Sequence, residues 1–339
     1  MEHILQKYQQ VPVTEHPNQV QQTPLVSVCI QAYNQCDYIR QCLDGVLSQE
    51  TNFEYEILIG EDGSKDGTRE ICIEYADKYP QSIKLFLHSR ENNITIDGTP
   101  TGRFNILYNM LSARGTYVAI CDGDDFWFDQ QKLQKQYDFL EAHPECVMVH
   151  TNYYLRAQAG PDQKYSSSIK PKYWPKREQL WLNNYIGTLT VLINRQALLK
   201  VINTRSDQLF NWLMLDYLLW LRLSELGRIG FLNTLTSVYN IHSNSMSSFD
   251  DMSRHIKFLK SGLKLQETVL PELVPREEQK SIKVLGYKTY ARKRFRLAVK
   301  SQNKPDAIQY YFKMRFITRL NPLNICKMFR VMFFPGETL

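Results

Sequence analysis

The sequence predicts an α/β fold with a mostly parallel sheet and flanking helices, followed by a helical C-terminal extension. Three observations support this prediction. Short apolar runs alternate with amphipathic segments over residues 25–150. Polar clusters stand at the ends of several of these runs. From Asp251 to about Phe316 the apolar residues recur at helical spacing.

The first half of the chain predicts a series of βαβ units. Leu25–Ile30 is a short apolar run, as expected of a buried parallel strand. Cys36–Leu47 follows with apolar residues at helical spacing. The further strands expected are 56–59, 83–87, 117–121 and 146–150, and the further helices are 67–79, 104–112 and 132–142. Right-handed crossovers between such strands produce a mostly parallel sheet.

The second half is less regular. Residues 151–185 are rich in loop signals, with Pro161, Pro171 and Pro175. The elements expected after them are a strand over 188–193, a helix over about 211–226, and two β segments over 229–232 and 235–241. The resulting organisation is an N-terminal extension (1–24), a main domain (25–250, with halves 25–150 and 151–250) and a basic helical region (251–339).

The composition is 43% hydrophobic and 22% charged, which is typical of a globular protein and excludes a disordered chain. The seven cysteines form no CxxC pair and several lie in apolar runs, so we expect buried, reduced thiols and a cytoplasmic protein. Residues 1–24 lack the apolar core of a signal peptide. The apolar stretch Leu209–Leu223 contains two charged residues and is too short to span a bilayer.

The charge is unevenly distributed. Residues 251–339 hold 19 Lys and Arg against 7 Asp and Glu, a net charge of +12, whereas the whole chain carries +6. Such a region suits an anionic surface, either membrane lipid or polyphosphate. Two interpretations stay open: peripheral membrane attachment, or a solvated helical face over a core.

Polar clusters follow three of the predicted strands: Tyr33-Asn34, Glu61–Ser64 and Asp122–Asp125. Ligands of parallel α/β sheets bind beyond the carboxyl ends of the strands, which is where these clusters lie. Their position is the first indication of a binding site.

The segment Asp122-Gly123-Asp124-Asp125 predicts a cation site. Three carboxylates within four residues repel one another unless a cation is present. Mg²⁺ or Mn²⁺ suits them, because these hard ions bind carboxylate and phosphate oxygens. Gly123 permits a tight turn. The alternative is an acidic solvated loop, but the apolar strand before the cluster and the aromatic run Phe126–Phe128 after it favour a site beside a packed pocket.

Three other residues have both a functional and a structural interpretation. Asp62 can accept hydrogen bonds from a base or ribose, or it can close a turn. Asp216 lies among apolar and aromatic neighbours, where a carboxylate tends to have a raised pKa that suits a general base; it can instead pair with Arg222 or another cation. His242 can bind a metal or a phosphate, or be a structural histidine.

Three blocks of sequence, in order, resemble the family 2 glycosyltransferases with the GT-A fold. Val26–Asn34 is similar to the first strand of that family and its "TYN" turn. Glu61–Thr68 resembles its "DDGSxDGT", and Gly115–Trp127 resembles its "GxYIAxLDGDDxW". In the second half, Asp216–Leu221, Tyr239–Ser243 and Asn184–Thr188 resemble one bacterial branch of the family.

The resemblance implies a role for each candidate residue. Tyr33, Asn34 and Asp62 border the base and ribose, and Asp122 and Asp124 form the DxD-type pair. The complete assignment is nucleotide-sugar binding by Ala32, Tyr33, Asn34, Asp62, Arg103, Asp122 and Gly123, metal binding by Asp124 and His242, and general base catalysis by Asp216. Three positions depart from the family pattern: Gln31 replaces Pro, Glu61 replaces Asp, and Leu215 precedes the base where Glu is common.

The resemblance also implies the reaction. An inverting glycosyltransferase, using Mg²⁺ or Mn²⁺, is expected to move a sugar from a nucleotide-diphosphate sugar, with a UDP-sugar as the expected donor. The expected acceptor is a hydroxyl of a glycan or lipid-linked oligosaccharide in bacterial cell-surface polysaccharide synthesis, at the inner face of the membrane, with no nucleic-acid partner. The alternatives are a catalytically inactive sugar-nucleotide-binding protein and a nucleotidyltransferase. The latter needs a Gly-rich triphosphate loop where this chain has Ala32–Gln35.

Overall fold

The computed structural model describes residues 6–20, 23–157, 163–164, 177–242 and 252–313. They belong to two compact units. The first unit comprises the described residues of Met1–Lys176, Tyr185–Asn211 and Leu218–Asn240, and the second those of Arg177–Asn184, Trp212–Tyr217 and Ile241–Leu339. The domain limits drawn from the sequence stay predictions.

A four-stranded parallel sheet forms the centre of the first unit. Its strands, in spatial order, are β4 (Ile83–Leu87), β3 (Tyr55–Glu61), β2 (Val26–Ala32) and β7 (Tyr117–Asp122). All three pairings are parallel. The apolar residues of β2 are buried on both faces because helices cover both sides, which is why most of this strand is apolar. The α/β fold with a parallel central sheet is therefore confirmed.

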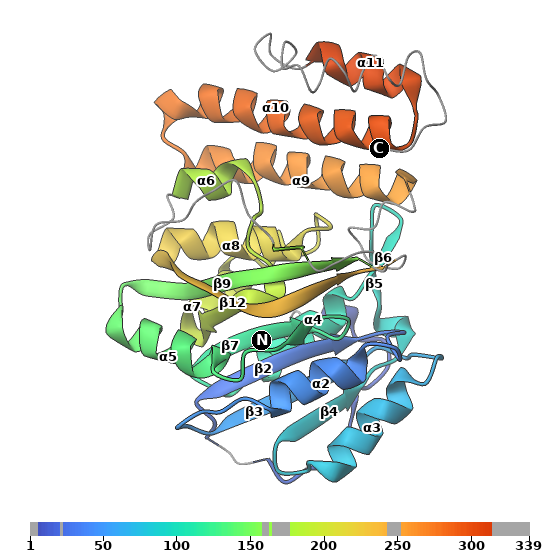
Figure 1. Cartoon of the computed structure of the whole chain (residues 1–339), viewed down its shortest axis with the longest axis vertical. Helices are drawn as coiled ribbons and strands as arrows, with labels where there is room; N and C mark the ends of the chain where they lie inside the picture. The colour runs from blue at the N-terminus through green and yellow to red at the C-terminus, as the bar shows by residue number, and fades with distance from the viewer. Residues whose placement is uncertain (1–5, 21–22, 158–162, 165–176, 243–251, 314–339) are drawn as a thin grey trace. The chain divides into compact units, whose positions relative to one another are not determined.

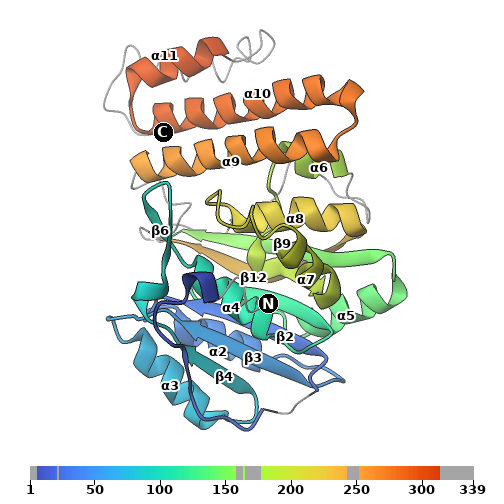
Figure 2. The ribbon, with the colours of Figure 1, turned by 180° about the vertical axis from the view of Figure 1, so that it is seen from behind.

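Helices cover both faces of this sheet. They are α2 (Ile39–Leu47), α3 (Thr68–Lys78), α4 (Arg103–Ser112) and α5 (Lys132–Ala142). Figure 1 shows α2 and α3 in front of β2–β4, and Figure 2 shows α4 on the opposite face. The α4 helix approaches β3 closely at Gly60, where a Cβ atom would lie 1.7 Å from Asn105 Oδ1. The Asn105 side chain donates instead to the Gly60 carbonyl (2.7 Å).

Antiparallel strands extend the sheet beyond β7. They are β11 (Val191–Asn194), β9 (Cys146–Ala157), β12 (Arg228–Ile241) and β8 (Phe126–Trp127), with β10 (Gln163–Lys164) beside β9 and β1 (Thr14–Glu15) beside β4. A separate hairpin joins β5 (Ile94–Ile96) and β6 (Thr99–Thr101). The two β segments expected over 229–241 are one strand, β12.

The structure differs from the sequence prediction around residue 190. The strand expected over 188–193 begins with a 3₁₀ turn, η2 (Thr188–Thr190), because the backbone N–H and the hydroxyl of Thr190 both donate to the Gly187 carbonyl. The sequence analysis also did not predict α7 (Arg195–Thr204), which Asn194 caps by accepting from the Ala197 N–H (3.0 Å).

The second unit is helical. It contains α6 (Arg177–Leu182), the first residues of α8 (Leu215–Leu226), α9 (Met252–Leu273), α10 (Arg276–Lys300) and α11 (Lys304–Lys313). The last three lie side by side in Figures 1 and 2 and pack around buried Leu259, Tyr290 and Phe295. The predicted helical region is confirmed over 252–313. No helix of the described ranges has the length and apolarity needed to cross a bilayer.

Candidate active site

Three strand ends meet at one edge of the parallel sheet. In the strand register, Gln31 of β2 lies opposite Asp122 of β7, and Ala32 lies opposite Glu61 of β3. The turns that follow β2, β3 and β7 therefore leave the sheet side by side. The polar clusters singled out in the sequence are brought together at this edge.

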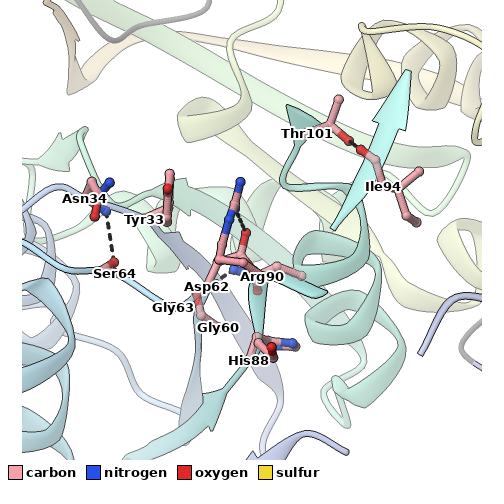
Figure 3. Close-up of polar contacts among 12 residues, drawn as sticks. Tyr33, Asn34, Gly60, Asp62, Gly63, Ser64, His88, Arg90, Ile94 and Thr101 are labelled. Atoms are coloured by element: carbon pink, nitrogen blue, oxygen red, sulfur yellow. Dashed lines mark hydrogen bonds and ion pairs between the residues drawn. The ribbon is translucent and has the colours of Figure 1, made fainter. Parts of the chain in front are cut away.

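One group at the edge consists of Tyr33, Asp62 and Arg90 (Figure 3). The Arg90 guanidinium lies 3.9 Å from the centroid of the Tyr33 ring and forms an ion pair with the Asp62 carboxylate. Tyr33 is 41% exposed, whereas Asp62 is only 4% exposed. An aromatic ring stacked with a guanidinium, beside a buried hydrogen-bond acceptor, can receive a planar base.

Arg90 was not predicted from the sequence. It is the first residue of η1 (Arg90–Asn92), the short turn after β4. The signal that could have found it is positional, because it follows the fourth parallel strand at the same carboxyl edge. The backbone of Gly63, at φ +73°, lies beside the Arg90 side chain. A Cβ atom at Gly63 would be only 3.0 Å from Arg90 Cγ.

Burial determines the protonation of Asp62. The pKa of Asp62 is raised to about 6, chiefly by removal from water, and the charge of neighbouring Glu61 acts in the same direction. The guanidinium of Arg90 acts in the opposite direction and keeps the carboxylate available near neutral pH. Asp62 thus changes charge just below physiological pH.

Hydrogen bonds hold the Tyr33 turn against the turn after β3. Asn34 adopts φ 51°, a left-handed conformation that Asn tolerates better than most residues. Its N–H donates to Ser64 Oγ (2.9 Å), and its Oδ1 accepts from the Lys65 N–H (3.0 Å). The buried Ala32 contributes its carbonyl, which accepts from the Asp62 N–H (2.9 Å).

Glu61 builds the turn after β3. Its fully buried carboxylate accepts from the backbone N–H groups of Ser64 (2.7 Å) and Gly63 (3.2 Å), and it forms an ion pair with Arg69. The Arg69 guanidinium also donates to the His88 carbonyl (2.7 Å). Glu61, which stands where the resembled family usually has Asp, therefore stabilises the turn after β3.

The acidic segment after β7 is a tight turn. The Asp125 N–H donates to the Asp122 carbonyl, and the Gly123 N–H donates to the Gln31 carbonyl, each at 2.9 Å. A Cβ atom at Gly123 would lie 2.5 Å from Gln35 Oε1 and 3.0 Å from the Gln31 carbonyl oxygen, so this position has no room for a side chain.

Asn240 of β12 holds the turn from the other side. Its side chain donates to the Asp124 carbonyl (2.6 Å), and its N–H donates to Asp125 Oδ1 (2.9 Å). Burial raises the pKa of Asp125 well above its usual range, and the charges of Asp124 and Asp122 add to this. The Asp125 side chain is therefore used to hold the turn, which leaves Asp122 and Asp124 as the candidate cation ligands.

This pair fits a divalent cation that a diphosphate would share. Within the described part of the chain, no three acidic, His or Cys side chains form a ready metal cage. Mg²⁺ and Mn²⁺ need no such cage, since one or two carboxylates and the phosphate oxygens of a substrate suffice. The Asp122 carboxylate also accepts from the Thr188 hydroxyl (2.8 Å).

The remaining predicted residues belong to other elements. Arg103 is the buried first residue of α4. Asp216 and His242 belong to the second unit. Asp216 lies in the first turn of α8, and its Oδ2 accepts from the Asn184 side chain (2.6 Å). His242 is buried and directly follows β12. The roles assigned to these three residues stay predictions.

Comparisons with known proteins agree with this architecture. The family model described as "Glycosyl transferase family 2" matches residues 27–200. The uncharacterized protein Rv1520 of Mycobacterium tuberculosis is 33% identical over 225 residues, which are 65% of this chain and 60% of that protein. The chain thus matches less than two thirds of the length of its first curated relatives.

Two further relatives have descriptive names. The putative teichuronic acid biosynthesis glycosyltransferase TuaG of Bacillus subtilis is 33% identical over 66% of this chain and 82% of its own length. The UDP-Glc:alpha-D-GlcNAc-diphosphoundecaprenol beta-1,3-glucosyltransferase WfaP of Escherichia coli is 28% identical over 73% of this chain and 90% of its own length.

Solved structures share the fold. TarS 1–349 of S. aureus aligns with a TM-score of 0.55 and 14% identity, over 91% of this chain and 86% of that one. The mannosyltransferase PcManGT of Pyrobaculum calidifontis, in complex with GDP-Man and Mn²⁺, aligns with a TM-score of 0.51 and 13% identity, over 97% and 89%. These likenesses confirm the predicted GT-A fold class.

Proposed function

The chain belongs to glycosyl transferase family 2, and on this premise we propose that it is an inverting, metal-dependent glycosyltransferase. The donor is a nucleotide-diphosphate sugar, with a UDP-sugar preferred. The acceptor is a hydroxyl of a glycan or lipid-linked oligosaccharide in cell-surface polysaccharide synthesis, on the cytoplasmic side of the membrane. The names of TuaG and WfaP support this class of acceptor.

One observation carries the proposal: the ends of β3, β2 and β7 bring a base platform and a carboxylate pair to the same edge. Tyr33 and Arg90 present the platform, and Asp62 accepts a hydrogen bond from the base. Asp122 and Asp124 are proposed to face the diphosphate, and the register of β2 beside β7, with Gln31 opposite Asp122, supports this. A nucleoside diphosphate has the same order of parts, a base followed by two phosphates.

The carboxylate pair would hold Mg²⁺ or Mn²⁺, with His242 as a further proposed ligand, and the complex of PcManGT with Mn²⁺ supports this choice of ion. Such an ion, when bound, neutralises the charge that develops on the departing diphosphate. Arg103 is proposed to add positive charge beside the same group. Gly123, whose missing side chain lets the turn pack against Gln31 and Gln35, is proposed to border the nucleotide sugar.

Asp216 is the proposed general base. It takes the proton from the acceptor hydroxyl while that oxygen attacks the anomeric carbon on the face opposite the diphosphate. The bond from the anomeric carbon to the phosphate oxygen breaks with its electron pair, which leaves on the nucleoside diphosphate, so the configuration inverts. A positioned base is typically worth about 10²–10⁴-fold in rate.

A panel of UDP-, GDP- and dTDP-sugars, assayed with Mg²⁺ or Mn²⁺, tests the proposal. Transfer or donor hydrolysis by the unaltered protein is expected with one nucleotide class. Asp216→Asn should retain donor binding and lose at least about 100-fold in transfer, whereas Asp207→Asn, at an exposed position, is the matched control. Donor binding without any turnover by the unaltered protein would favour the inactive binding protein instead.

The basic C-terminal region is proposed to contact anionic membrane lipid. The first half of α10 exposes Val284 and Tyr287, which by helical spacing lie on the same side as the exposed Lys280 and Lys283. Apolar side chains flanked by lysines suit the boundary between head groups and acyl chains.

Co-sedimentation with phosphatidylglycerol-containing vesicles tests this contact. Binding should fall in the double variant Lys280→Glu/Lys283→Glu and remain in Lys200→Glu, which reverses an exposed charge on α7. Equal sedimentation of both variants would contradict it.

A further inference from the structure

Thr188 connects the acidic turn to a distant part of the chain. Its hydroxyl donates to Asp122 Oδ2 at 2.8 Å, although the two residues are 66 positions apart. Both belong to the first unit. Thr188 is the first residue of η2, the 3₁₀ turn that replaces the expected start of a strand.

Buried side chains fix this turn. The indole Nε1–H of Trp127 donates to the Leu189 carbonyl, and the side-chain amide of Gln136 donates to the Thr190 carbonyl, each at 2.8 Å. Trp127 follows the acidic turn directly and is buried, as is Gln136 of α5. Two donors from different elements therefore hold the peptide groups that come just after Thr188.

A buried lysine fixes the donors in turn. Lys132 is fully buried, its Nζ donates to Gln136 Oε1 (2.7 Å), and the same nitrogen lies 3.9 Å from the centroid of a Trp127 ring. Because Oε1 of Gln136 faces the lysine, its Nε2–H is directed to the Thr190 carbonyl. Lys132 thus supports Gln136, and Gln136 supports the η2 turn. The turn then presents the Thr188 hydroxyl to Asp122.

We propose that Thr188 is a positioning residue, which orients the Asp122 carboxylate so that this side chain and Asp124 bind one divalent cation with the donor diphosphate. This inference rests on the proposed function. A hydroxyl donor held by a rigid turn restricts rotation of the carboxylate. Because the hydroxyl is neutral, it does not cancel the negative charge that attracts the cation. Groups that orient metal-binding side chains in this way typically contribute 10–100-fold to metal affinity.

Calorimetric titration of the full chain with UDP, with and without Mn²⁺, tests the proposal. Thr188→Val keeps the shape of the side chain and removes the hydroxyl. It is expected to weaken UDP binding in the presence of Mn²⁺ by about 10–100-fold and to leave metal-free UDP binding unchanged. Thr188→Ser, which keeps the hydroxyl, should restore the increase in UDP affinity that Mn²⁺ produces.

Thr51→Val is the matched control. Thr51, like Thr188, is partly buried, and its hydroxyl donates to the Phe53 carbonyl (2.7 Å) rather than to a carboxylate. The variant should lose thermal stability without losing the increase in UDP affinity that Mn²⁺ produces. If Thr188→Val does not fold, Thr188→Ala replaces it in the comparison with Thr188→Ser.

The outcomes separate the two proposals. Equal UDP affinity of Thr188→Val and the unaltered protein in Mn²⁺ would overturn the positioning role while leaving the proposed function intact. An equal loss with and without Mn²⁺ would show a general structural role and also overturn it. If the unaltered protein binds no UDP under either condition, the proposed UDP-sugar donor falls, and the inference falls with it.

Discussion

Replacing Asp62 with asparagine is expected to remove a pH dependence from the stability of the protein. Burial raises the pKa of Asp62 to about 6 in the folded state, against 3.8 for an ordinary aspartate. The folded state therefore binds the proton more tightly than the unfolded state does. The free energy of unfolding contributed by this group falls as the pH rises from about 4 to about 6, and it is constant above that.

The size of the effect follows from the difference in pKa. About 2 units, at 1.36 kcal/mol for each, correspond to about 3 kcal/mol. The Asp62→Asn variant does not titrate at this position. Because the unfolded state is already partly ionised at pH 4, the variant's free energy of unfolding, relative to the unaltered protein, should rise by about 2 kcal/mol between pH 4 and pH 7.

Urea denaturation at pH 4, 5, 6 and 7, followed by tryptophan fluorescence, measures this difference directly. Other titrating groups are common to both proteins and cancel. Arg90→Gln is the companion variant: its cation lowers the pKa of Asp62, so its loss should move the pH-dependent step above pH 6. A difference between Asp62→Asn and the unaltered protein that stays constant across this range would refute the reasoning.

Two further predictions concern the acidic turn and its support. Gly123→Ala should cost about 1–3 kcal/mol of stability and weaken Mn²⁺-dependent UDP binding, because its Cβ would lie 3.0 Å from the Gln31 carbonyl oxygen; Gly102→Ala, with nothing within 4 Å, should change neither. Denaturation and calorimetry measure both. Burial lowers the pKa of Lys132 to about 7, so the folded state favours the neutral amine. The stability of Lys132→Met relative to the unaltered protein should be greatest at pH 6 and decline toward pH 10; no decline would contradict the buried position against Trp127.

The sequence was sufficient for the parallel half of the fold, and the reason is local. A strand covered on both faces must be largely apolar, so β2 and β7 stand out without knowledge of their neighbours. Helices with one buried stripe show equally clear spacing, as in Ile39, Leu43 and Val46 of α2. The second half was harder, because β12 and η2 owe their form to pairing and side-chain contacts with distant residues.

The same division applies to the site. Position alone predicted that Tyr33, Asp62 and Asp122 share one edge of the sheet, since polar residues after buried parallel strands meet at its carboxyl edge.

The sequence by itself determined the fold class, the order of the central parallel strands along the chain and the position of the acidic segment at the end of β7. Only the tertiary structure decided that Arg90 pairs with Asp62 and that Thr188 reaches Asp122. Arginine and threonine are common at many surface and loop positions, so neither has a local signature. Their partners lie 28 and 66 residues away, and such contacts exist only when the strands have paired in register.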